Sequence, residues 1–428
     1  MLKTSLIVGP GFDRFLETVS RALASLLEAA ASEGFLRIYS YPSLDSLAAA
    51  SIVYSRALKL GVRVSLSVAL EPPPQVFEPT VLLGFGSLNY KSNSVTSKLI
   101  AFYSGELKSI PVHGATYVDG QGSLSSMVFM ALTGARDFDP TVLTAFLTGS
   151  YSGGFVDPSG RFQGLDREAF ERLKSSRAPV DVVTTIKVYK PTVRDACTGI
   201  AHTLNPYYPG LTGHKDRCLE LLENSGLRDV TGRPLSTLDH KALEAIVAAV
   251  TEGVRRISGV SLKRADIVSA IVVSADPRMP KDFREASDTL IYAAEHTGSL
   301  HRITATLIDL EVEYPMAEGR LEAYATRLSN IASTMKPQRV KGSPNIKIYE
   351  APLNPQDPPT MAWRAFKLLG MVESDSIIAC RVDDELAASP LQVEEALGPG
   401  GAKRLVELGM AKFEGGLLWV KKLNARQN

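Results

Sequence analysis

The N-terminal third of the chain alternates between two hydrophobic periodicities. Apolar residues recur at helical spacing over 12–31, and 36–41 then alternates between apolar and polar positions as a half-buried strand does. A second helix and strand are expected at 43–60 and 62–69, and 81–86 is a short apolar run of strand length. Repeated strand–helix units of this kind predict a parallel sheet covered by helices.

The pattern changes near position 185. Helical periodicity over 192–203, 215–225 and 238–257 predicts a helical connector, after which strand and helix patterns return. The elements expected beyond the connector are a strand at 267–273, a helix at 283–295, a strand at 303–312, an amphipathic helix at 319–335 and a strand at 345–350. We therefore predict an α/β protein with two α/β lobes, 1–185 and 265–428, joined by a helical connector at 186–264.

Charge and cysteine content narrow the class of protein. The chain has 47 Lys and Arg residues against 46 Asp and Glu residues, so a net charge of +1 excludes a uniformly basic nucleic-acid coat but leaves room for a local basic groove. No apolar run approaches the roughly 18 residues that a membrane span needs. Three scattered cysteines, Cys197, Cys218 and Cys380, exclude a disulfide framework and a Cys-rich zinc site, and they fit a reducing cytoplasm.

Common nucleotide and metal motifs are absent from the sequence. There is no G-x-x-x-x-G-K-[ST] loop and no G-x-G-x-x-G after a strand, and none of the six histidines pairs with another at metal-ligand spacing. Arg255, Arg256, Lys263 and Arg264 form a basic cluster between the predicted lobes. This cluster is a candidate contact for a nucleic-acid backbone, and the ordinary alternative is surface charge at helix ends.

Four stretches of the chain resemble the DHH phosphoesterase family, specifically the archaeal RecJ-like proteins. Residues 40–50 resemble the first family motif, S-H-x-D-x-D-G followed by an apolar helix, and 81–87 resembles the second. Residues 205–213, Asn-Pro-Tyr-Tyr-Pro-Gly-Leu-Thr-Gly, are similar to a stretch that follows the catalytic domain of the archaeal RecJ-like proteins and are the most specific match. Residues 311–315 look like the opening of the DHH-associated domain. The resemblance implies a DHH-like parallel-sheet domain and a smaller DHH-associated domain.

The metal ligands of that family are largely missing. Family enzymes hold two divalent ions, usually manganese, through aspartates and histidines. Neither 101–103, where the Asp-His-His triplet is expected, nor 148–153, where a further ligand is expected, contains Asp or His, and 400–402 is at best a remnant of the family's Gly-rich substrate loop. One carboxylate cannot hold two dications, so we expect no catalytic residue, no metal and no cofactor. The resemblance places the first-motif His at Tyr41, its two Asp positions at Ser43 and Asp45 and the Gly that follows at Ser46, and it places the second-motif Asp at Gly84. It thus implies a degenerate former metal site made of these five residues.

A scaffold of this family without its ligands is similar to the archaeal counterpart of the cell-division-cycle forty-five subunit. That resemblance implies a non-catalytic, pseudo-enzyme role in DNA replication, with the GINS complex and the MCM helicase as partners in a CMG-type replicative helicase. It also implies a place in the cytoplasm with the chromosomal DNA, where single-stranded DNA is a further candidate partner.

Two alternatives stay open at this point. The first is a metal-dependent, single-strand-specific exonuclease or small phosphodiesterase of the DHH family, with Asp45, His113, Asp119 and Asp157 as unusual ligands. The second is a protein that binds single-stranded DNA on its own through the basic cluster. The tail over 389–423 has the order of a winged helix, which binds DNA or protein in other chains, or it is a small closing subdomain with an apolar core.

Overall fold

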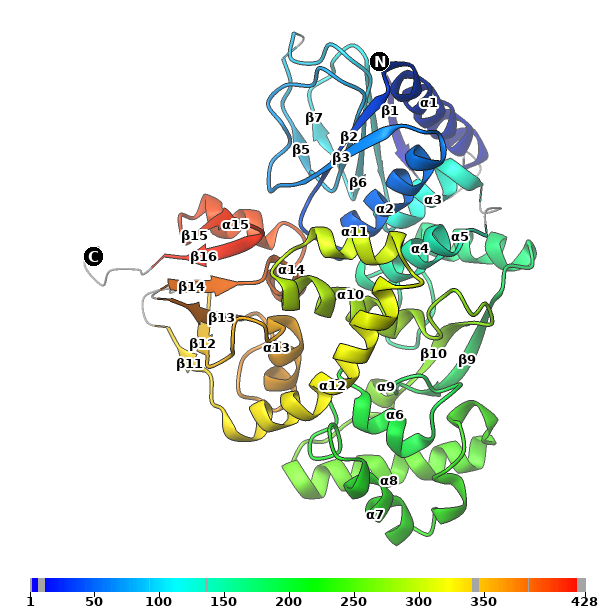
Figure 1. Cartoon of the computed structure of the whole chain (residues 1–428), viewed down its shortest axis with the longest axis vertical. Helices are drawn as coiled ribbons and strands as arrows, with labels where there is room; N and C mark the ends of the chain where they lie inside the picture. The colour runs from blue at the N-terminus through cyan, green and yellow to red at the C-terminus, as the bar shows by residue number, and fades with distance from the viewer. Residues whose placement is uncertain are drawn as a thin grey trace. The chain divides into compact units, whose positions relative to one another are not determined.

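The computed structural model describes residues 2–6, 12–91, 93–134, 138–340, 346–383 and 385–421. The chain divides into two compact units, each built from separated segments (Figure 1). Unit 1 comprises Met1–Asp157, Arg161–Val180 and Leu300–Glu313, and unit 2 comprises Pro158–Gly160, Asp181–Ser299 and Tyr314–Asn428. No helix among the described residues is both long enough and apolar enough to cross a membrane.

Unit 1 is built on a six-stranded sheet in which every strand pair is parallel, as the sequence predicts. The strand order is β1-β8-β6-β4-β2-β3, so the chain crosses over between non-neighbouring strands. All four residues of β4 are buried, as in parallel strands that are covered on both faces. The strands are β1 (Leu2–Leu6), β2 (Phe35–Ser40), β3 (Arg63–Val68), β4 (Thr80–Leu83), β6 (Leu99–Ser104) and β8 (Ala115–Gly120).

The described residues of unit 1 form six helices, and local capping explains where two of the central ones begin. The Ser43 side chain accepts a hydrogen bond from the Ser46 amide at the start of α2, and Ser123 does the same for Ser126 at the start of α3. Helix α2 packs against α3, α4 and α11. The helices are α1 (Phe12–Glu33), α2 (Leu44–Lys59), α3 (Leu124–Thr133), α4 (Pro140–Ser152), α5 (Gly164–Ser175) and α11 (His301–Ile308).

Unit 2 contains a two-stranded sheet, a helical part and a second six-stranded sheet. The two-stranded sheet pairs β9 (Val180–Ile186) with β10 (Val268–Ser274). The larger sheet has the order β11-β12-β13-β14-β16-β15 and is mixed, because β12 and β13 are parallel while the other pairs are antiparallel. Its strands are β11 (Gln338–Arg339), β12 (Ile348–Ala351), β13 (Ile377–Val382), β14 (Glu385–Ala388), β15 (Ala411–Glu414) and β16 (Leu417–Val420).

The helices of unit 2 include all those expected in the connector. A buried apolar cluster joins α6, α7 and α8, with Ile200, Leu222 and Val250 fully buried within it. The helices are α6 (Ala196–His202), α7 (Lys215–Asn224), α8 (His240–Ser258), α9 (Arg264–Ile267), α10 (Phe283–Thr297), α12 (Glu313–Thr334), α13 (Pro359–Leu368), α14 (Pro390–Leu397) and α15 (Gly401–Glu407).

The two-lobed α/β class is confirmed, since the structure has a parallel sheet and a second, mixed sheet. The domain boundaries at 185 and 264 stay predictions. The expected strand at 303–312 is wrong, because α11 occupies His301–Ile308. Ile303 and Leu307 are four residues apart and both fully buried, which is the spacing of one face of a helix. The apparent alternation of apolar and polar residues over 303–312 therefore did not indicate a strand.

One disulfide bond was not foreseen by the cysteine count. Cys197 and Cys218 are bonded to one another, with their Cα atoms 5.4 Å apart, and they join α6 to α7 inside the buried cluster. Cys380 is free and buried. The sequence argument excluded a framework of several bridges and gave no sign that these two cysteines meet.

Candidate functional site

The first two family-like stretches meet at the ends of neighbouring parallel strands. The Tyr41 amide donates to the Leu83 carbonyl over 2.8 Å, and the Gly84 amide donates to the Phe102 carbonyl over 3.0 Å. These bonds continue the ladders that join β2, β4 and β6. The structure therefore brings the predicted site residues together where the strands end, as expected for a site on a parallel sheet.

Gly84 leaves no room for an aspartate at the second-motif position. Its φ of +87° lies in the left-handed region that favours glycine. A Cβ atom at this position would overlap the Ser46 hydroxyl and lie 2.9 Å from the Tyr41 Cβ. Ser46 in turn accepts a hydrogen bond of 2.8 Å from the Ser43 hydroxyl. The side chains of Ser46 and Tyr41 thus fill the space that an aspartate at position 84 would need.

Asp45, in the stretch that resembles the first family motif, is buried against the start of a helix. Its carboxylate accepts hydrogen bonds from the backbone amides of Leu124 at 2.7 Å and Ser125 at 3.0 Å, at the N-terminus of α3. Burial raises the pKa of Asp45 to about 7, although these two amides favour the charged form. The N-terminus of α3 thus places a partial positive charge beside this carboxylate.

A buried network of serines surrounds a second carboxylate, Asp166, that the sequence pattern did not reveal. Asp166 accepts from the Ser123 amide at 2.8 Å and from the Ser123 hydroxyl at 2.6 Å. The same hydroxyl lies 2.8 Å from the Ser126 hydroxyl, which is 3.3 Å from that of Ser150. Burial raises the pKa of Asp166 as well. The serine-rich run at 123–126 was the available signal, since buried hydroxyls need partners.

The stretch expected to supply a further ligand lies inside a helix and is tightly packed. Residues 148–152 belong to the last part of α4. A Cβ atom on Gly149 would overlap the Ser125 hydroxyl and lie 2.9 Å from a carboxylate oxygen of Asp45. A Cβ atom on Gly153 would lie 3.2 Å from the other oxygen of Asp45. Larger residues at these positions would displace Asp45.

These residues do not fit a two-metal centre. A pair of dications needs several oxygen or nitrogen acceptors, whereas the groups that face Asp45 and Asp166 are backbone amides and serine hydroxyls. Within the described residues, no three His, Cys, Asp or Glu side chains form a group that could hold an ion. No catalytic step through a metal follows from this arrangement.

The alternative ligands proposed from the sequence also have other contacts. Asp119 is buried and accepts from the Leu107 amide over 3.2 Å, and Asp157 accepts from the Arg161 amide over 3.0 Å. His113 is exposed on the loop before β8. The part of the chain that the structure describes gathers no three of these candidates, Asp45 included, around a common point.

The turn at 400–402, predicted to be at best a remnant of a substrate loop, binds a side chain of the same chain. The Glu394 carboxylate accepts hydrogen bonds of 2.8 Å from the amides of Gly400 and Ala402. These two amides, on either side of Gly401, hold the carboxylate of Glu394 as their anion. The tail has the expected order of helix, turn, helix and hairpin. Leu405 and Leu418 are buried in it, whereas Leu408 is 54% exposed.

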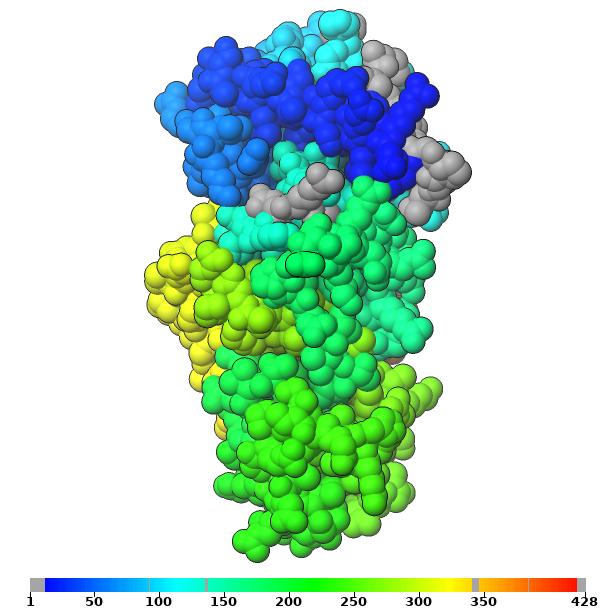
Figure 2. Space-filling model, turned by 90° about the vertical axis from the view of Figure 1, so that its right-hand side faces the viewer, coloured from blue at the N-terminus to red at the C-terminus, as the bar shows by residue number. Residues whose placement is uncertain are grey.

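The basic cluster lies on the helical part of unit 2. Arg255 and Arg256 both pair with Glu252 on α8, and Arg264 of α9 pairs with Glu244 of α8. All three arginine side chains are more than half exposed, and Figure 2 shows the green α7–α8 segment as a broad surface in the lower part of the view. Lys263 is the N-cap residue of α9, directly before Arg264. Each arginine has a glutamate beside it, so the surface is mixed in charge, and a nucleic-acid role for it stays a prediction.

Taken together, these features define a two-lobed α/β fold in which the site on the parallel sheet is closed by its own side chains. Solved structures share this architecture. The chain is similar to the crystal structure of CDC45 from Entamoeba histolytica, with a TM-score of 0.59 and 7% identity over 96% of this chain and 97% of that one. At this identity the likeness shows the fold. The predicted resemblance is thereby confirmed at the level of the fold.

RecJ structures were also found. RecJ from Thermus thermophilus in complex with Mn²⁺ gives a TM-score of 0.40 and 13% identity over 97% of this chain and 53% of that one. Exonuclease RecJ bound to manganese gives a TM-score of 0.36 and 13% identity over 86% of this chain and 81% of that one. No family model and no curated protein matches the sequence.

Proposed function

We propose that the protein is a non-catalytic RecJ-like subunit of the DNA replication machinery. The observation that carries the proposal is the closure of the former metal site, where Asp45 is buried on the amides of Leu124 and Ser125 and Gly84 excludes a second carboxylate. A phosphodiester could reach neither a metal nor a water nucleophile at this point of the fold. The scaffold then acts by holding other molecules rather than by chemistry.

The partners that we propose are the GINS complex and the MCM helicase, in an assembly of the CMG type. Support comes from the similarity in fold to CDC45 over nearly the whole length of both chains and from the sequence match at 205–213. In this role the two lobes provide docking surfaces. The mixed charge around Arg255 and Arg264 suits a protein partner, or a DNA strand held with the help of other subunits.

The test of the partner proposal is affinity purification of the tagged chain from lysate of its native host at moderate salt. We expect GINS and MCM subunits at near-stoichiometric amounts by mass spectrometry. The matched bait is Arg256→Glu, which reverses a single charge on an exposed face. This variant should retain the fold, because the Arg256 side chain is 73% exposed. Recovery of neither partner with the wild-type bait would remove the proposed assembly.

The non-catalytic part is tested separately by metal analysis and a nuclease assay. Protein purified in manganese should hold far less than one ion per chain and should not shorten a labelled single-stranded oligonucleotide. About two ions per chain that are lost on Asp45→Asn, together with cleavage of the oligonucleotide, would instead support the metal-dependent exonuclease or phosphodiesterase. Because metal content and partner recovery are independent measurements, either half of the proposal can fail alone.

A further inference from the structure

The two bonded cysteines of unit 2 lie on either side of the most specific sequence match. Cys197 is in the first turn of α6 and Cys218 is in the first turn of α7, and the bond between them spans 21 positions. The loop at 203–213 is therefore closed into a covalent ring by its two flanking helices. The function proposed above makes no use of this bond.

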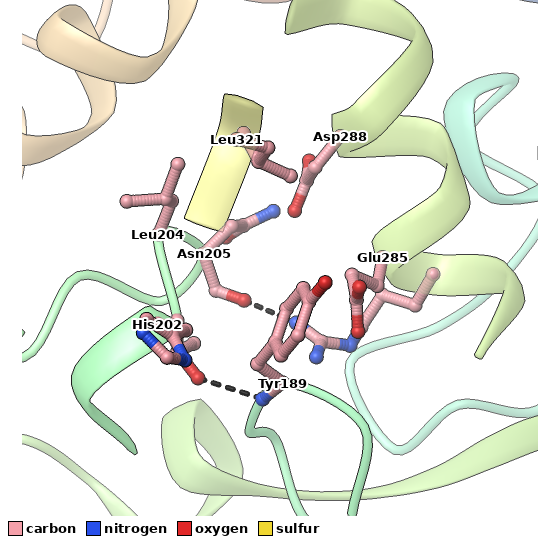
Figure 3. A pocket seen from close by; sticks show the side chains of 9 residues that line it. Tyr189, His202, Leu204, Asn205, Glu285, Asp288 and Leu321 are labelled. Atoms are coloured by element: carbon pink, nitrogen blue, oxygen red, sulfur yellow. Dashed lines mark hydrogen bonds between the residues drawn. The ribbon is translucent and has the colours of Figure 1, made fainter. Parts of the chain in front are cut away.

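The start of the closed loop is held by hydrogen bonds to other elements of unit 2. The Asn205 carbonyl accepts from Arg284 of α10, and the Tyr189 amide donates to the Thr203 hydroxyl over 2.8 Å. Figure 3 shows these two bonds as the dashed lines at Asn205 and Tyr189. Because the partners come from α10 and from the segment before α6, the start of the loop is anchored on two sides.

The end of the loop packs against α12. The Thr326 hydroxyl donates to the Gly213 carbonyl over 3.4 Å, and a Cβ atom on Gly213 would lie only 2.8 Å from the Thr326 Cα. His214 Nε2 lies 3.1 Å from the Ser329 hydroxyl on the same helix. The backbone therefore approaches α12 closely just before α7 begins, which leaves no room there for another molecule.

The two bonded sulfur atoms are enclosed by apolar side chains. Cys197 and Cys218 are both fully buried, in a cluster that contains Ile200, Leu222 and Val250. A thiol reduces a disulfide as the thiolate, which must reach one of the two sulfur atoms. Bringing that charge into an apolar cluster without a partner is costly. A reductant can therefore attack the bond only after the cluster opens.

We propose that the bond between Cys197 and Cys218 is a cross-link that thiol reductants cannot reach while unit 2 is folded. The bond then persists in the presence of reductant and is lost only when α6, α7 and α8 separate. It reports whether this part of the chain is folded, rather than how reducing the surroundings are.

The exchange that breaks the bond in the opened state is balanced. One thiolate of a dithiol attacks a cysteine sulfur, the S–S bond breaks, and a mixed disulfide forms. The second thiolate of the same dithiol displaces the cysteine from the mixed disulfide, so the reductant leaves as a cyclic disulfide. Both cysteines become thiols with the two protons that the dithiol gave up. The bond forms by the reverse exchange with an oxidised disulfide, before the cluster closes.

The test counts thiols on the purified full chain. Folded protein is incubated with dithiothreitol, the reductant is removed, and every thiol is then labelled with a maleimide in denaturant. We expect one label per chain, on the free Cys380, whereas the same incubation in denaturant should give three. Three labels after incubation of the folded protein would overturn the proposal.

The same count shows whether the bond exists in the cell. The chain taken from cells of the native host that were quenched in acid should carry one thiol. Three thiols on this material would show that the bond does not form there, which also overturns the proposal. In the Cys380→Ser background the folded and denatured incubations should give no label and two labels, which assigns the two to the bridge.

A matched pair of substitutions tests whether the apolar cluster is the shield. Leu222→Ala removes a fully buried side chain of the cluster and should speed reduction of the folded protein by at least about tenfold. Leu408→Ala makes the same change where the side chain is 54% exposed and should leave the rate unchanged. If Leu222→Ala does not fold, Val250→Ala takes its place. Equal rates of reduction in the buried and the exposed variant would refute the assigned shield.

Discussion

Replacing Asp45 by Asn should make the stability of unit 1 less dependent on pH. In the folded chain the pKa of Asp45 is about 7, against an ordinary value of 3.8. The folded state therefore holds the proton more tightly than the unfolded state does. The stabilising contribution is complete below the unfolded pKa, and it is lost as the pH rises through 7.

The size of the effect follows from linkage between protonation and folding. For a shift of this size, the contribution of Asp45 to the free energy of unfolding falls by about 2–3 kcal/mol between pH 5 and pH 8. The asparagine side chain does not titrate, so this part of the pH dependence disappears in the variant. Its amide also faces one of the two backbone donors, Leu124 or Ser125, with its own NH₂ group, which adds a cost that is the same at every pH.

The assay is denaturant unfolding of wild type and Asp45→Asn at several pH values between 5 and 8. Circular dichroism follows the whole chain, and hydrogen exchange of the α3 amides reports on unit 1 locally. The difference in unfolding free energy between the two proteins should change by about 2–3 kcal/mol over this range, with the variant gaining on the wild type as the pH rises. If the free energy of unfolding depends on pH in the same way in both proteins, the helix N-terminus keeps Asp45 ionised. Its amides would then outweigh the effect of burial on the pKa of Asp45.

Three further changes probe other parts of the chain. Gly84→Asp places an aspartate at the second-motif position and should still bind no manganese. It should lower the free energy of unfolding by about 3–5 kcal/mol, because its Cβ would overlap Ser46 and its φ is positive. A melting temperature at or above that of wild type would contradict this packing argument. Replacing Cys197 and Cys218 by Ser should cost about 3 kcal/mol in denaturant unfolding, because the bridge spans 21 positions, and an unchanged midpoint under non-reducing conditions would show that the bond does not form. If single-stranded DNA binds the basic cluster, Arg255→Ala with Arg256→Ala should lower the affinity for it and reduce the salt dependence of that affinity, as measured by fluorescence anisotropy. Identical titrations of variant and wild type would show that DNA does not bind there.

Most elements of the fold were predictable because their periodicity and their ends agree. The helix expected at 283–295 is α10, which begins after the capping residue Asp282 and ends at Gly298 in the left-handed conformation. Strand β8 escaped prediction because Tyr117 and Asp119, a polar and a charged residue, lie in the middle of a buried strand. Its burial depends on partners that are distant in sequence, and a single-sequence pattern does not contain that information.

The sequence predicted which stretches form the candidate site but not how its side chains are held. The stretches that contain Tyr41, Ser43 and Gly84 were identified from the sequence, and the structure brings them together. The partners of Asp45 were not predictable, because the amides that bind it come from α3, some 80 positions later. Asp166 was missed for the same reason, since its link to Ser123 spans 43 positions and no local motif marks it.

The division of unit 1 into separated segments has a consequence for how the chain folds during synthesis. Helix α11 packs on α2 and α4, and the Thr304 hydroxyl reaches the Leu47 carbonyl across 257 positions. The N-terminal unit therefore cannot be completed when its first 180 residues have left the ribosome, because one of its helices is made only after α6 to α10 of unit 2. Until residue 308 emerges, the face of α2 that α11 covers stays open to solvent or to a chaperone.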